Sequence, residues 1–146
     1  MNVERLMALD IGEKRIGIAV SDLLGVTAQG VGVYNRVNNQ KDLAYLTELF
    51  RQYECTGLVI GLPHHLSGEL GTVALRIMKF GKRLGASCGV EPVFWDERLT
   101  TVQAERALLE GNLSRKRRRQ IIDQLAAQLI LDSYLNYRRT RQNQDW

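Results

Sequence analysis

The first forty residues alternate between apolar and polar positions in a way that predicts β-strands. Two short apolar runs, 6–11 and 15–21, are separated by the turn residues 12–14, and the pair predicts a β-hairpin. Valines then alternate with glycines over 27–34, which predicts a third strand. The chain therefore begins with three strands joined by short connections.

Helical spacing first appears over 42–53, where apolar residues recur every three or four positions. The apolar run 57–62 is followed by Pro63 and predicts a strand buried on both faces of a sheet. The same two periods predict, in order, a helix over 70–84, a strand over 90–95 and helices over 101–109 and 120–137. This order predicts an α/β fold with a mixed central sheet that starts as a hairpin meander and carries helices on both faces.

Composition is typical of a globular domain. Of 146 residues, 45% are hydrophobic and 25% are charged, and we expect one domain over 1–138 and a short basic and polar tail over 139–146. No apolar stretch approaches the roughly 18 to 20 residues of a membrane helix, and the start resembles no signal peptide, so we expect a cytoplasmic protein without a membrane partner. The isolated Cys55 and Cys88 are expected to be free and structural.

Positive charge is concentrated near the end of the chain. The formal net charge is +4, but residues 114–141 alone carry eight basic and two acidic residues, so the remainder is slightly acidic. Clustered arginine and lysine favour binding of a polyanion such as nucleic acid. A solvated helix start or a basic tail would show the same charge, and composition alone does not separate these interpretations.

One acidic residue lies where a buried apolar side chain is expected. At 100° per residue, Asp123 shares the apolar face of the last helix with Ala126, Ala127, Ile130 and Tyr134. A carboxylate on a buried face requires a cation, an ion pair or hydrogen bonds. Asp123 is therefore either a functional ligand or one partner of a buried salt bridge or a loop cap.

Further acids follow two predicted strands. Asp10 ends the first strand, and Asp96 and Glu97 end the strand over 90–95. Ligands of open α/β sheets collect at the carboxyl ends of the strands, so these acids and Asp123 are predicted to converge. Converging carboxylates repel one another unless a hard divalent cation binds them, and Mg²⁺ or Mn²⁺ is the natural candidate. Two such ions about 3.5 to 4 Å apart can activate a water and stabilise the leaving oxygen of a phosphodiester.

Four segments in this order, ALDIGEKRIGIAVSD, VIGLP, FWDERLTT and RRQIIDQLAAQLIL, resemble the successive motifs of the YqgF/RuvX family. That family is described as Holliday-junction resolvases and as pre-16S rRNA processing nucleases with a ribonuclease-H-like fold. The resemblance spans nearly the whole chain and implies that its three catalytic acids are Asp10, Glu97 and Asp123. The choice of Glu97 over Asp96 rests on the resemblance, since strand alternation places the two on opposite faces without saying which face is active.

The resemblance implies a metal-dependent nuclease acting on structured nucleic acid, either pre-16S rRNA at its 5′ end or branched DNA. Asp10 would bridge two Mg²⁺ or Mn²⁺ ions, Glu97 and Asp123 would each hold one, and the products would carry a 3′-hydroxyl and a 5′-phosphate. A four-way junction would suit a homodimer. The alternative is a nucleic-acid-binding or ribosome-associated factor that keeps the fold without hydrolysis.

Basic residues near these acids are candidate contacts to the nucleic acid. They are Lys14, Arg15, Arg98, Arg115, Lys116, Arg117, Arg118 and Arg119. For Lys14 and Arg15 the alternative is an exposed turn, and for Arg98 it is a salt bridge to Asp96 or Glu105.

Other polar and glycine positions are interpreted as structural. Gly12 and Gly17 are expected to supply positive φ at the hairpin rather than a phosphate loop, and Thr100 is expected to cap a helix with Gln103. His64 and His65 follow a predicted strand without the spacing of a zinc site, and we expect both to be peripheral. Whether either histidine or Asp96 contributes to the site stays open.

Overall fold

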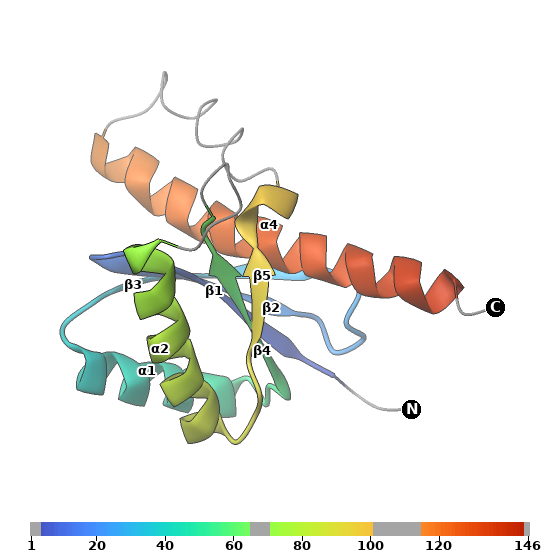
Figure 1. Cartoon of the computed structure of the whole chain (residues 1–146), viewed down its shortest axis with the longest axis horizontal. Helices are drawn as coiled ribbons and strands as arrows, with labels where there is room; N and C mark the ends of the chain where they lie inside the picture. Colours follow the sequence, from blue (N-terminus) through green and yellow to red (C-terminus); the bar gives the residue numbers. More distant parts are fainter. Residues whose placement is uncertain (1–3, 65–70, 101–114, 145–146) are drawn as a thin grey trace.

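The hairpin at the start of the chain forms the middle of a five-stranded sheet (Figure 1). A computed structural model of the chain describes residues 4–64, 71–100 and 115–144. The sheet has the order β3-β2-β1-β4-β5, in which β1 is antiparallel to β2 and parallel to β4. Its strands are β1 (Leu6–Ile11), β2 (Arg15–Ser21), β3 (Ala28–Asn35), β4 (Gly57–Leu62) and β5 (Val93–Asp96). The predicted mixed sheet with an initial meander is confirmed.

Helices cover both faces of this sheet (Figure 1). Helices α1 (Asn39–Gln52) and α2 (Thr72–Cys88) pack on one face, and α4 (Arg115–Gln144) crosses the other. A 3₁₀ turn, η1 (Glu97–Leu99), follows β5. The α/β class with helices on both faces is therefore confirmed, while the helix predicted over 101–109 lies outside the described residues. None of the described helices has the length and apolar character that crossing a membrane requires.

The last helix is longer than the sequence pattern predicts. It includes the basic residues 115–119, which were expected to precede it, and it continues through residues 139–144, which were expected to form a tail. Contacts to distant parts of the chain hold its polar end: Arg138 forms an ion pair with Glu4, and Arg139 donates a hydrogen bond to the carbonyl oxygen of Val26. Residues 139–144, which belong to the tail expected over 139–146, are helical because these contacts stabilise helix where the apolar periodicity has ended.

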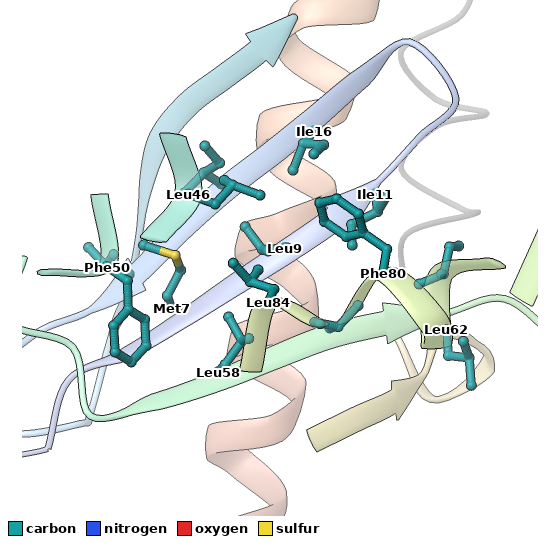
Figure 2. Close-up of a cluster of buried hydrophobic side chains, with 14 of the residues drawn as sticks. Met7, Leu9, Ile11, Ile16, Leu46, Phe50, Leu58, Leu62, Phe80 and Leu84 are labelled. Carbon is teal, nitrogen blue, oxygen red and sulfur yellow. The ribbon is translucent and has the colours of Figure 1, made fainter. Parts of the chain in front are cut away.

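Alternation along β1 divides the core into two layers. Met7, Leu9 and Ile11 point toward α1 and α2, and Figure 2 shows this cluster with α4 passing behind the strands. Leu6 and Ala8 belong to the other cluster, which packs against α4. Because side chains two residues apart share a face, the carboxylate of Asp10 lies on the α4 side of the sheet, where the residue is only 8% exposed.

A buried ion pair anchors the start of α1 to its neighbours. The Asp42 carboxylate accepts hydrogen bonds from the Arg36 guanidinium at 2.9 Å and from the Val37 backbone N–H at 3.0 Å. Burial favours the neutral acid, but these bonds outweigh it and lower the pKa of Asp42 below the ordinary value of 3.8. Asp42 therefore stabilises the fold in its charged form.

We expect Asp42→Asn to lower the free energy of unfolding by about 2 kcal/mol at neutral pH, because a buried charged hydrogen-bond acceptor is lost. Since the folded-state pKa is depressed, this contribution is present above pH 3.8 and disappears as the pH falls below it. Urea unfolding at pH 7 and near pH 3 measures the difference between variant and wild type. Glu48→Gln is the control, because it removes an exposed acid paired with Arg51 on the same helix. Equal losses for the two variants would contradict the prediction.

Candidate active site

A glycine on β2 brings the last helix close to Asp10. Asp10 pairs with Gly17 across the hairpin, and a Cβ atom at Gly17 would lie 1.9 Å from the backbone oxygen of Asp123. The α4 backbone can approach the sheet here only because Gly17 has no side chain. Neither Gly12 nor Gly17 is among the described glycines with positive φ, so the prediction that both supply positive φ at the hairpin is wrong. The close approach of α4 is the physical reason for glycine at position 17.

A second glycine gives Glu97 its place on the other side of Asp10. Gly61 lies on β4, the other neighbour of β1, and a Cβ atom there would lie 2.9 Å from Oε1 of Glu97 and 2.4 Å from Cδ1 of Ile130. The Glu97 carboxylate thus extends over β4 on the face that α4 covers. Gly17 and Gly61 flank the strand of Asp10, and each leaves room for one of the other two acidic residues.

The turn that carries Glu97 is tied to the same helix that carries Asp123. The indole N–H of Trp95 donates to Oγ of Ser133 at 3.0 Å, and that hydroxyl donates to the carbonyl oxygen of Leu99 at 3.1 Å. The Trp95 ring packs edge-on against Tyr134 with centroids 5.3 Å apart. Both aromatic residues belong to the apolar cluster on the α4 side of the sheet, and together with Ser133 they fix η1 against α4.

Asp96 lies apart from Glu97. Trp95 packs into the α4 cluster, so alternation along β5 turns Asp96 to the opposite face. There its carboxylate accepts a bidentate pair from Arg98, with a shortest distance of 2.7 Å, and lies 3.2 Å from Nδ1 of His64. The hydrogen bonds from Arg98, aided by the nearby His64, lower the pKa of Asp96 below 3.8. Of the two predicted roles for Arg98, the salt bridge to Asp96 is the one that the structure shows.

The Asp123 carboxylate is paired with Arg15. Oδ2 of Asp123 lies 2.7 Å from Nε of Arg15, the first residue of β2, and the side chains are 18% and 27% exposed. The salt bridge predicted as one alternative for Asp123 is therefore present. Arg15 was predicted to contact the nucleic acid, and in the structure its guanidinium binds this acidic residue of the candidate site.

The donor chemistry fits a hard divalent cation, since Asp10, Glu97 and Asp123 offer only carboxylate oxygens. Within the described ranges, however, no three acidic, histidine or cysteine side chains are gathered closely enough to hold one ion together. Binding of a cation by these three carboxylates therefore requires their side chains to move. The clearest change is that Asp123 must release Arg15 before its carboxylate can bind the cation.

A known protein family matches the chain over most of its length. A family model described as RuvX, Holliday junction resolvase, matches residues 4–137. The chain belongs to the RuvX family. A relative from Moorella thermoacetica is 52% identical over 90% of this chain and 94% of its own, and one from Clostridioides difficile is 46% identical over 92% and 95%. Both carry the name "Putative pre-16S rRNA nuclease".

Solved structures similar to this RuvX chain share its fold at low sequence identity. RuvC of T. thermophilus in complex with a Holliday junction substrate has a TM-score of 0.59 at 12% identity, covering 92% of this chain and 96% of its own. The fowlpox virus Holliday junction resolvase has a TM-score of 0.50 at 12% identity, covering 91% and 98%. The ribonuclease-H-like fold implied by the sequence motifs is confirmed.

The other basic candidates of this RuvX chain lie at two places. Lys14 is exposed at the tip of the β1–β2 hairpin, and Arg117 is exposed in the first turns of α4. Arg115, Lys116, Arg118 and Arg119 belong to the same turns, and their side chains lie outside the described part, as does His65. Thr100 closes η1 by donating from Oγ1 to the carbonyl oxygen of Glu97, and Gln103, its expected capping partner, is not among the described residues.

Proposed function

We propose that this RuvX chain is a divalent-metal-dependent nuclease that hydrolyses phosphodiester bonds in structured nucleic acid. The acidic set is Asp10, Glu97 and Asp123. The observation that carries the proposal is the pair of glycines beside Asp10: Gly17 admits the α4 backbone at Asp123, and Gly61 admits the Glu97 carboxylate. A binding protein without hydrolysis has no need for such space around a buried acid.

Each acid has a distinct setting for this chemistry. Asp10, Glu97 and Asp123 would hold Mg²⁺ or Mn²⁺, which would supply an activated water and stabilise the leaving oxygen of a phosphodiester. Asp10 is the most buried of the three and lies on the central strand, between the approaches of the other two acids. Glu97 and Asp123 approach from η1 and α4, one on each side. Arg15 offsets the charge of Asp123 and so reduces repulsion within the set.

We favour the 5′ end of pre-16S rRNA as the substrate over a Holliday junction. Relatives that share about half of the residues over nearly their full length carry the rRNA name, whereas the RuvC resolvase shares 12%. Trimming one RNA end needs only a monomer, whereas a four-way junction suits a two-fold dimer that places two sites on opposed strands. Oligomeric state therefore helps to distinguish the two substrates.

Cleavage assays on precursor rRNA and on junction DNA test the proposal. We expect the wild type to cut the RNA with Mg²⁺ or Mn²⁺, and activity to fall to background when a chelator removes the ions and to return when either ion is restored. Asp132→Asn, an exposed position on α4, is the control that keeps activity. Binding of both nucleic acids without cleavage of either under any metal condition would overturn the nuclease and favour the binding factor.

A further inference from the structure

A groove of about 930 Å³ lies on the face of the sheet opposite α4. Its walls are the tip of the β1–β2 hairpin, the connection between β3 and α1, and the exposed side of α2. None of these segments contributes to the acidic set, and the sequence pattern did not predict that they would enclose a groove.

The walls of this groove carry a surplus of positive charge. Five basic side chains line it against two acidic ones, Glu13 and Asp42. Asp42 is already paired with Arg36, whose guanidinium also donates to the Gly12 carbonyl oxygen and lies over the Phe80 ring. Arg36 and Asp42 thus neutralise each other at the base of the groove, and the contacts of Arg36 join the hairpin tip, α1 and α2.

The remaining four cations are available to a ligand. They are Lys14, Arg76, Lys79 and Arg83. All four are exposed, and none makes an ion pair or side-chain hydrogen bond within the described part of the chain. Glu13 is the one acid on the described walls that Arg36 does not neutralise. A surplus of unpaired cations around a concave surface attracts a polyanion.

The arrangement of these cations suits a chain of phosphates. Arg76, Lys79 and Arg83 are spaced by three and four residues, so they form one row along α2. Lys14 faces this row from the hairpin, and the N-terminus of α1, capped by Asn38, adds the partial positive charge of a helix start. A row of cations along one wall matches a repeating anion better than a single small one.

One end of the groove lies next to the acidic set in the chain. Ile11, the first lining residue in the chain, directly follows Asp10, and Gly12 and Lys14 lead around the hairpin tip. The side chains of Asp10 and Ile11 point to opposite faces of the sheet at the carboxyl end of β1. A nucleic acid that reaches Asp10 on one face can therefore pass the hairpin tip and enter the groove on the other.

We propose that this groove binds the phosphate backbone of the nucleic acid that flanks the cleaved position. The inference rests on the proposed nuclease function and extends it to a second face of the molecule. The groove contacts the backbone without reading bases, so its contribution is independent of sequence and decreases with salt. Substrate length beyond the scissile bond then adds affinity.

The test compares two lysines of α2 that differ in position alone. Lys79 and Lys82 are both exposed on the same helix, but only Lys79 lines the groove. Binding of a labelled B-form DNA duplex is measured by fluorescence anisotropy at several salt concentrations, with a chelator present so that no cleavage occurs. We expect Lys79→Gln to make the slope of log affinity against log salt shallower by about 0.9, and Arg76→Gln with Arg83→Gln by about 1.8. Lys82→Gln should leave the slope unchanged.

Each other outcome has a defined meaning. Equal effects of Lys79→Gln and Lys82→Gln would show a general charge effect and overturn the groove, as would no effect of the groove variants. If the wild type cleaves neither substrate while Lys79→Gln still reduces the slope, the nuclease proposal fails and the groove stands. If cleavage is normal and the slope does not change, the groove fails and the nuclease stands.

Discussion

Asp10→Asn is expected to reduce the cleavage rate at least about a thousandfold while leaving the affinity for nucleic acid intact. That loss corresponds to about 4 kcal/mol of transition-state stabilisation, as expected when a carboxylate that would hold the catalytic cations loses its charge. Asp10 lies in the middle of the sheet, with the other two acids approaching over the strands beside it. No neighbouring carboxylate can replace it, because Gly17 and Gly61 occupy the adjacent positions. Single-turnover cleavage and a separate binding measurement give the two numbers.

Asp22→Asn is the matched control for this substitution. Asp22 follows β2 and accepts hydrogen bonds from the backbone N–H groups of Val26 and Thr27, a role that the amide oxygen of asparagine can keep. We expect this variant to cleave at the wild-type rate. Thermal melting of both proteins shows whether either has lost its fold. A folded Asp10→Asn protein with more than about a tenth of the wild-type rate would exclude Asp10 from a shared metal-ligand role.

Gly17→Ala is expected to destabilise the protein by about 3 kcal/mol and to reduce cleavage in the fraction that folds. The added methyl group would meet the backbone oxygen of Asp123, and a helix backbone cannot give way as a side-chain end can. The helix must then shift away from β2, and Asp123 moves with it. A displacement of about 1 Å at a catalytic group can cost a hundredfold in rate. Urea unfolding and single-turnover cleavage measure the two effects.

Gly30→Ala tests the same helix contact with a softer neighbour. A Cβ atom at Gly30, on β3, would meet the side chain of Gln124, which is exposed and can rotate aside. We expect a change in the free energy of unfolding of less than about 1 kcal/mol and an unchanged rate. Similar losses for Gly17→Ala and Gly30→Ala would mean that the closeness of the α4 backbone at Gly17 is not what places Asp123.

Local pattern was sufficient for three of the strands, whereas β5 begins three residues later than predicted. The bounds of the hairpin strands and of β4 agree with their apolar runs, because strand alternation and the turn residues act within a few positions of the chain. The ends of α4 could not be found in this way. Its final turns are polar, and the contacts that hold them, to Glu4 and to Val26, come from more than a hundred residues away.

The candidate site was predictable in part. Asp123 could be found from sequence because an acid on an apolar helical face needs a physical explanation, and the strand-end position indicated Asp10. Glu97 could not be separated from Asp96 by alternation alone, because the pattern does not say which face Trp95 occupies. The structure packs Trp95 against α4 and places the Glu97 carboxylate beside Gly61 on that face. Gly17 could not be recognised as a packing position because its neighbour in space, Asp123, is distant in sequence.

The groove could not be predicted from sequence. The spacing of the α2 cations can be seen in the sequence, but the segments that enclose the groove with them come from other parts of the chain.

The position of α4 at the end of the chain has a consequence for the newly made protein. The five strands of the described sheet precede residue 100, as do Asp10 and Glu97. The helix that covers one face of this sheet and carries Asp123 comes afterwards. Synthesis proceeds from the amino end, so a growing chain carries an uncovered apolar surface and two of its three acids. When α4 packs against the sheet, it covers this surface and adds Asp123 to the acidic set in the same step. A chain interrupted before this event would be a client for chaperones or proteases and not a nuclease.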